Sequence, residues 1–283
     1  MRKSACLLIL PLLLQLPAGN REVEAQEKVW KDVAEFSYVV TGGNAVSATL
    51  GFTNKLTWDL GSTALELTVG ALRAESTTLE RVVTSAGPPP VVSEVSDTRL
   101  TAESYRAGLA LDRDLSEKMF LYAAAGWKRN RFSGIENQFS AAGGIGSTWI
   151  DEDHHSFKTE YAATWTSQED VVPGPEGTRS FAGARLTWSY LIQLSESTTY
   201  TNDLAVDENL KDTADLRADM VNSLQVAMSR SLALKVSLQL LFDNQPALTA
   251  ATDPDNLLGA GESVLIELEK LDTIFTVSVV VNF

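Results

Sequence analysis

The sequence predicts an all-β fold: an antiparallel transmembrane β-barrel of about 12 strands that follows a cleaved signal peptide. Three observations predict it. Apolar and polar residues alternate with a period of two, short and long connections alternate along the chain, and proline is missing from the alternating segments. The mean hydropathy of -0.03 does not argue against this fold. Lipid-facing and lumen-facing residues alternate in such a barrel, so no long apolar run is expected.

Residues 1–25 have the pattern of an export signal. Arg2 and Lys3 precede an apolar stretch over residues 5–16, and Val23-Glu24-Ala25 is a small-x-small cleavage site. The apolar stretch is too short to span a bilayer as a lasting helix. We therefore expect export across the inner membrane, removal of the signal and delivery to the bacterial outer membrane.

The signal fixes the expected start of the barrel. We expect the mature chain to begin at Gln26, with cleavage after Ala18 as the alternative, and residues 26–283 to form the barrel. Cys6 is the only cysteine and lies within the signal. The mature chain would then have no thiol for a disulfide, a metal site or a nucleophile, and the sequence predicts no cofactor.

The alternation is clearest over residues 45–60. One face of this segment is apolar: Ala48, Leu50, Phe52, Leu56, Trp58 and Leu60. The other face is small or polar: Ser47, Thr49, Gly51, Thr53, Lys55, Thr57 and Asp59. A helix would scatter both sets around its axis, so the pattern predicts a strand with one face in lipid.

The same reading predicts twelve strands along the mature chain. Their ranges are 30–40, 45–59, 62–73, 98–112, 118–129, 137–150, 155–167, 178–192, 196–206, 214–229, 231–243 and 263–283. The connections alternate between tight and long, with long ones after residues 40, 73, 129, 167, 206 and 243. Outer-membrane barrels have short periplasmic turns and longer extracellular loops, which sets the expected orientation.

Proline and aromatic residues give two independent checks. All seven prolines after the signal fall in the expected long loops: Pro88, Pro89, Pro90, Pro173, Pro175, Pro246 and Pro254. Aromatic residues gather at strand ends, as in the girdles at two membrane interfaces. Beside short turns and the C-terminus lie Trp58, Phe120, Tyr122, Trp149, Phe157, Trp188, Tyr190, Tyr200 and Phe283; beside long loops lie Trp127, Phe139, Trp165, Phe181 and Phe242.

The last strand carries an apolar row that ends in an aromatic residue. We expect this row to act as the signal for the barrel-assembly machinery; its residues are Phe275, Val277, Val279, Val281 and Phe283. A secreted soluble β-sandwich that binds a ligand is the alternative fold, because it too alternates. It explains neither the alternating connections nor the paired girdles.

Several short motifs resemble one bacterial family. Trp30 to Phe36 with Thr41-Gly42-Gly43-Asn44, Ala142 to Gly146, Leu194 to Ser197 and Phe242 to Pro246 are similar to segments of the salt-induced outer membrane proteins, domain of unknown function 481. The resemblance covers nearly the whole mature chain. It implies an outer-membrane barrel with a stress-linked role and no established biochemical activity.

The charges inside the expected barrel are nearly balanced. If the apolar rows face lipid, the inward charges are Glu35, Lys55, Glu66, Arg106, Lys158, Glu160, Arg185, Asp203, Arg217, Asp219 and Lys235. Opposite charges on neighbouring strands should pair and partly fill the lumen. This predicts a structural envelope protein or a small, poorly conducting pore of unknown physiological role.

The excess negative charge lies in the expected loops. Lys and Arg total 23 against 37 Asp and Glu, a net charge of -14, which argues against nucleic acid as a partner. The acidic loop residues are Glu169, Asp170, Glu176, Asp207, Glu208, Asp212, Asp215, Asp253, Asp255 and Glu262. They could attract divalent cations and, through them, the phosphates of outer-membrane lipid. No oligomeric state is predicted.

One segment leaves an enzymatic alternative open. His154 and Ser156 have the His-x-Ser spacing of some outer-membrane lipid hydrolases, with Gln168 or Glu169 in the place of the orienting residue. Asp151-Glu152-Asp153 could join the histidines in a metal site. We expect neither, because the histidines lie at a predicted periplasmic turn, and so predict that the protein is not an enzyme.

Overall fold

The computed structural model describes residues 29–41, 45–85, 91–131, 133–173, 177–250 and 265–283. The predicted signal peptide lies outside these residues. The strands are β1 (Val29–Thr41), β2 (Ala45–Asp59), β3 (Thr63–Ser85), β4 (Val91–Ser116), β5 (Met119–Asn130), β6 (Ile135–Glu152), β7 (His155–Asp170), β8 (Arg179–Ser195), β9 (Thr198–Asn209), β10 (Leu216–Ala227), β11 (Leu232–Asp243), β12 (Leu248–Ala250), β13 (Leu265–Glu267) and β14 (Leu271–Asn282). No helix among the described residues is long and apolar enough to cross a membrane.

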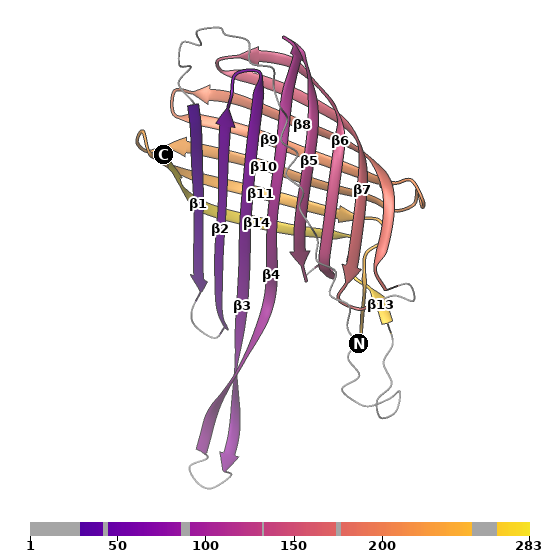
Figure 1. The fold of residues 1–283 in the computed structure, drawn as a ribbon. Helices are drawn as coiled ribbons and strands as arrows, with labels where there is room; N and C mark the ends of the chain where they lie inside the picture. Colours follow the sequence, from indigo (N-terminus) through magenta and orange to yellow (C-terminus); the bar gives the residue numbers. More distant parts are fainter. Residues whose placement is uncertain (1–28, 42–44, 86–90, 132, 174–176, 251–264) are drawn as a thin grey trace, which may run out of the picture.

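Twelve of these strands form one closed antiparallel barrel. Each strand from β1 to β10 pairs with the next, β11 pairs with β14, and β1 closes the ring against β14 (Figure 1). Strands β12 and β13 form a separate two-stranded sheet in the connection between β11 and β14. The predicted fold class is confirmed, and the soluble sandwich alternative is wrong.

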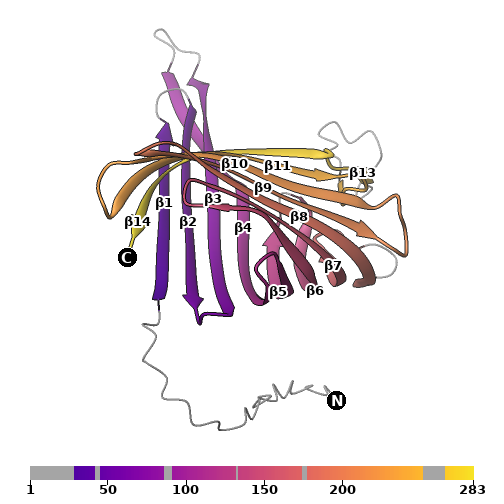
Figure 2. The ribbon, with the colours of Figure 1, turned by 90° about the horizontal axis from the view of Figure 1, so that it is seen from above.

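The two sides of the barrel cross at a steep angle. In Figure 1, β1 to β4 run nearly vertically, while β9, β10, β11 and β14 run across behind them. The view from above shows the same two groups of strands (Figure 2). Barrel strands tilt by about 35–45° from the axis, so strands on opposite walls cross in this way.

Large apolar side chains cover the outside of the barrel. Leu50 is 58% exposed, Trp149 60% and Phe275 67%, although all three lie within strands or at their ends. Polar side chains such as Ser223 and Ser278 are instead 4% exposed on the inward rows. This inverted arrangement suits a protein surrounded by lipid.

The C-terminal row lies on this outer surface. Val277 is 39% exposed, Val279 45% and Phe283 69%, in line with Phe275, and Val281 on the same row is half-buried. The predicted row therefore faces the outside of the barrel. Its recognition by the assembly machinery stays a prediction.

Three aromatic residues expected in the girdles face inward. Phe120 is 5% exposed, and a Cβ at Gly146 would lie 2.0 Å from its ring, so glycine there makes room for the ring. Tyr122 shares the inward row of β5 with Phe120. Phe181 is 8% exposed beneath the Arg217 guanidinium. Closeness to a turn predicts depth in the membrane but not side-chain direction, and the prediction was wrong for these rings.

The expected long loop after residue 73 is mostly strand. β3 and β4 continue past their neighbours as a two-stranded ribbon, since β2 pairs with β3 only as far as Thr78 and β5 with β4 only as far as Ser104 (Figure 1). Valine and threonine on both sides of the prolines favour strands. A strand is limited in length by the bilayer only where it lies in lipid.

The last expected strand is also shorter than predicted. Residues 263–283 do not form one strand: β14 begins at Leu271, and β13 pairs with β12 outside the barrel. Among the described prolines, Pro173 and Pro246 both lie outside strands, as expected. The other five fall outside the described residues.

Candidate functional site

All eleven predicted lumen charges lie on the inward rows of their strands. Two pairs of them meet directly. Lys235 Nζ lies 2.6 Å from Glu35 Oε1, reaching across β14, and Lys55 Nζ lies 2.6 Å from Glu66 Oε2 on the neighbouring strand. The first pair is about one-fifth exposed and the second much more so.

Two predicted arginines pair with residues that the sequence had assigned to loops. Arg185 donates from Nε and Nη2 to the two carboxylate oxygens of Asp207, at 2.8 and 3.0 Å. Arg217 Nε lies 3.2 Å from Asp215 Oδ1, and the Asp215 side chain is 6% exposed. Strand β9 extends to Asn209, past the expected end at residue 206, and brings Asp207 inside. Assigning both aspartates to a solvated rim was therefore wrong.

The remaining predicted charges contact neutral groups. Glu160 accepts from Thr187 at 2.7 Å, Asp203 from Ser189 at 2.6 Å and Asp219 from Gln239 at 2.8 Å. Arg106 donates to Thr53 at 3.4 Å, and Lys158 forms no ion pair with any residue that the structure describes.

Several inward groups escaped the sequence prediction. Lys128 faces the lumen directly opposite Arg106, and Asp112, Asp243 and Asp272 also lie on inward rows. Two of these aspartates line the same cavity as Lys128. All four lie within the predicted strand ranges, so applying the alternation of two to the ends of those strands would have found them. The lumen is consequently more acidic than the near balance that we expected.

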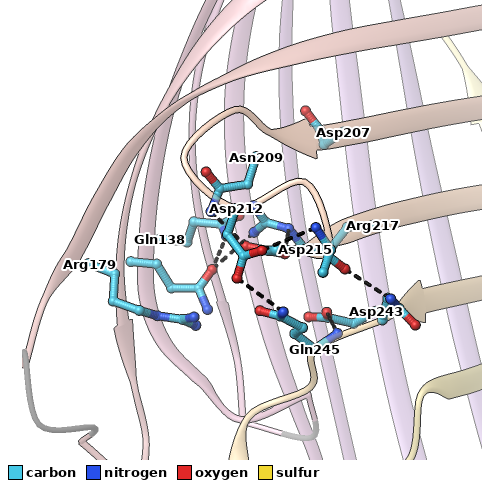
Figure 3. Close-up of polar contacts among 12 residues, drawn as sticks. Gln138, Arg179, Asp207, Asn209, Asp212, Asp215, Arg217, Asp243 and Gln245 are labelled. Carbon is cyan, nitrogen blue, oxygen red and sulfur yellow. Dashed lines mark hydrogen bonds and ion pairs between the residues drawn. The ribbon is translucent and has the colours of Figure 1, made fainter.

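Polar side chains form a dense network at the end of the barrel that carries the long loops (Figure 3). Arg217 Nη1 donates to Gln168 Oε1 at 3.2 Å, and Gln168 also accepts from Gln138 and donates to Asp170. Asn209 donates to Asp215 at 3.0 Å. Gln168 and Asp215 are each 4% exposed, so this network is shielded from solvent. We call these residues the mouth network.

Two connections pack over the mouth network. The turn after β5 meets the connection between β11 and β14, where a Cβ at Gly134 would lie 2.4 Å from that of Ala247. Gly134 has a φ of +70°, which glycine adopts without strain. Ser133 donates to Asp272 at 2.7 Å, and Ile135 beside it is 5% exposed. These two connections therefore contact each other beside the mouth network.

The lumen below the mouth network holds a row of small cavities. One of about 100 Å³ lies beneath the network and is lined by Lys128, Arg217 and Asp243. A second of about 280 Å³ shares Asn130 with it, and a third of about 150 Å³ is lined by Arg106. A fourth, of about 230 Å³, meets the first at Arg185.

The residues of the hydrolase alternative do not come together. His154 lies in the turn between β6 and β7, where its Nδ1 is 2.7 Å from Gln193 Oε1. Ser156 is the second residue of β7, whereas Gln168 and Glu169 lie at the far end of the same strand. Twelve strand residues span about 40 Å. A hydrogen-bonded triad from these residues is therefore not possible.

The expected cation-binding groups are largely engaged by protein. Asp170 pairs with Arg179 at 3.0 Å, and Asp212 accepts from Gln245 at 3.1 Å, in addition to Asp207 and Asp215 above. Four of the predicted acidic residues, Glu176, Asp253, Asp255 and Glu262, fall outside the described residues. Within the described part of the chain, no group of histidine, cysteine, aspartate or glutamate side chains could hold a metal ion.

Comparison with known families matches residues 34–283 to the family described as "Protein of unknown function, DUF481". The chain belongs to this family. The expected family is thus confirmed, while the salt-induced role remains an expectation. Within curated proteins, the uncharacterized protein YdiY of Escherichia coli strain K12 is 22% identical over 231 residues, which cover 80% of each chain.

Solved structures similar to this DUF481 chain include a porin and a translocator domain, both of low sequence identity. The NanC porin covers 89% of this chain and 98% of its own length, with a TM-score of 0.46 and 10% identity. The translocator domain of the autotransporter NalP from Neisseria meningitidis covers 92% of this chain and 90% of its own, with a TM-score of 0.44 and 11% identity.

Proposed function

We propose that this chain is an outer-membrane β-barrel with an obstructed, poorly conducting lumen, acting as a structural envelope protein or a small pore. The observation that carries the proposal is the mouth network, in which shielded ion pairs and amides close the long-loop end. An ion would have to displace these contacts to pass. The apolar outer rows support the outer-membrane location.

The resemblance to salt-induced proteins adds the expectation of a role in envelope stress. Removal of residues 1–25 on export, attraction of divalent cations to the remaining acidic rim and recognition by the assembly machinery belong to the same proposal. We assign no enzymatic activity, and the separation of Ser156 from Gln168 and Glu169 along β7 supports that choice.

Conductance in a planar bilayer tests the obstructed lumen. The reconstituted full chain should give little or no steady current, and any current should be weakly cation-selective because the lumen and rim are acidic. Arg185→Ala should raise the current, since it removes the side chain that lies between two cavities and breaks the pair with Asp207. Lys158→Ala is the matched control, because it removes an inward cation that forms no ion pair among the described residues.

Two results would contradict the proposal. A large open-channel current from the unmodified protein would mean that the mouth network does not obstruct ions. Clear anion selectivity at low salt would mean that the lumen charges do not act as described. Raising the salt to 1 M should remove weak selectivity, because the Debye length falls to about 3 Å.

A further inference from the structure

The seam between the first and last strands is paired over a short stretch only. β1 and β14 are in register from Val33↔Asn282 to Phe36↔Val279. Beyond that, β1 continues to Thr41 and β14 extends back to Leu271, and in the described ranges neither strand has a ladder partner on this side. The two strands diverge away from the C-terminus (Figure 1).

This open seam lies within the apolar outer surface. Tyr38 on β1 is 71% exposed and Phe275 on β14 is 67% exposed. Free strand edges are costly in a bilayer, because lipid chains offer no hydrogen bonds to backbone groups. The seam therefore needs an occupant or water supplied from the lumen.

The cavity of about 280 Å³ opens at this seam. Five of its lining side chains are large and apolar: Leu72, Leu241, Ile274, Phe275 and Val277. Strand β14 contributes both inward and outward residues to the lining, from Asp272 to Val277. The cavity thus passes around the edge of β14 and joins the lumen to the outer surface.

A polar space adjoins the inner end of this cavity. The cavity of about 150 Å³ shares Ser37, Ser104 and Ile274 with it and is lined by Arg106. The Arg106 side chain lies over Gly70, where a Cβ would be 2.8 Å from its Nε. Glycine at this position therefore leaves room for the side chain.

Arg106 is available to bind an anion. It donates a hydrogen bond to Thr53 at 3.4 Å, and among the described residues no carboxylate lies within 4 Å of it. Glu35, in the same cavity, is already paired with Lys235. On the neighbouring strand, Lys128 stands directly opposite Arg106. The Arg106 side chain extends the other way, over Gly70 on β3 toward Thr53 on β2, so its charge is directed into the 150 Å³ cavity.

We propose that the seam between β1 and β14 binds an anionic single-chain amphiphile, with its apolar chain in the 280 Å³ cavity and its head group at Arg106. A carboxylate or a phosphate suits this head group, because both accept paired hydrogen bonds from a guanidinium. The site goes beyond the proposed function, since an obstructed lumen does not require it. It would draw its ligand sideways from the lipid phase rather than through the mouth.

Binding to the full chain in lipid nanodiscs tests the site with three probes of one chain length: dodecanoate, dodecyl phosphate and 1-dodecanol. Both anions should bind about tenfold more tightly than the alcohol, because only they form charge-assisted hydrogen bonds. A preference between the two anions distinguishes a fatty acid from a single-chain phosphate lipid, such as a lysophospholipid, as the ligand. Isothermal calorimetry or native mass spectrometry gives the affinities.

Three variants separate this site from general lipid binding. Arg106→Gln should abolish the preference for anions, Arg106→Lys should retain most of it, and Lys158→Gln should leave it unchanged. Ile274→Trp should fill the apolar cavity and weaken the binding of all three probes, including the alcohol. A tryptophan at Leu238, on the outer face of β11, is its control and should have no effect.

The opposite results would overturn the proposal. Equal affinity for dodecanoate and 1-dodecanol would show that Arg106 holds no head group. An equal loss of the anion preference in Arg106→Gln and Lys158→Gln would show the same. A dimer cross-linked through cysteines at Tyr38 or Phe275 would show that a second copy occupies the seam instead. A change in conductance does not bear on these outcomes, so failure of the pore proposal can be distinguished from failure of this binding proposal.

Discussion

Strand β11 is paired with both neighbours along almost its whole length, whereas β14 beside it is paired fully on one side only. The β11 ladders run from Ala233 to Asp243 against β10 and from Leu232 to Phe242 against β14. On its other side, β14 meets β1 only from Val279 to Asn282. One barrel thus contains a continuous wall and a seam that closes at one end.

The lumen shows a parallel difference. At the mouth network, Arg217 is paired with Asp215 and both are well shielded from solvent. Near the seam, Arg106 faces a cavity without a carboxylate partner among the described residues. The cation at the mouth is therefore neutralised by a shielded carboxylate, whereas Arg106 on the open side forms no ion pair with any carboxylate that the structure describes.

The largest expected effect comes from breaking the mouth network. Arg217→Met should lower the free energy of unfolding by about 3–5 kcal/mol, because it leaves the shielded Asp215 charge without its partner. Lys55→Met, which removes an inward lysine from a more exposed pair, should cost about 1 kcal/mol or less. Urea unfolding in lipid vesicles measures both. Similar costs for the two variants would mean that the mouth network is not the shielded part of the lumen.

A second test compares the wall and the seam at one depth. Leu238 and Phe275 are register partners on the outer face. Leu238→Arg should destabilise the barrel by about 2–4 kcal/mol near the bilayer midplane. Phe275→Arg should lower the free energy of unfolding clearly less, because the guanidinium of the introduced side chain can reach lumen water through the seam. Ser237→Arg is the inward control, directed into a cavity, and should also cost less.

Equal costs at Leu238 and Phe275 would show that the seam is closed in the membrane. Equal costs at Leu238 and Ser237 would contradict the assignment of the two faces of β11. The three variants are measured by the same unfolding experiment, so differences among them do not depend on the choice of lipid.

The smallest expected effect concerns backbone amides. Amide hydrogen exchange should be fast at alternate residues of β14 between Leu271 and Ser278, because every second N–H points to the free edge. Amides of β11 should be protected throughout, since both of its edges are paired. A difference of tenfold or more in exchange rate is measurable by NMR. Uniform protection along β14 would mean that β1 pairs with it fully.

The side-chain directions in the continuous wall were predictable from the sequence, because they depend only on neighbouring positions along one strand. Leu238 and Ser237 differ by one position, and a period of two places them on opposite faces wherever the strand begins. The same rule placed all eleven lumen charges. It failed for Asp207 because the predicted strand ended at residue 206, three residues before the observed end at Asn209.

The seam was not predictable, because it depends on the stagger accumulated around the ring. The outward row of β14 from Thr273 to Val281 looks the same whether or not β1 pairs with it. Closure depends on the register of every ladder together. The ion-pair partners of Arg185 and Arg217 were missed for a related reason, because these side chains pair with residues that become their neighbours only in the folded barrel.

The ribbon formed by β3 and β4 has a consequence for how other molecules meet this protein. Beyond Thr78 and Asp97, no third strand accompanies it. At about 3.3 Å per residue, the arm from Thr78 to Ser85 reaches roughly 25 Å past the rim. With the long loops outward, an antibody or a bacteriophage would touch this arm before the rest of the barrel. An epitope tag beside Ser85 would then report on the living cell surface without disturbing the lumen or the seam.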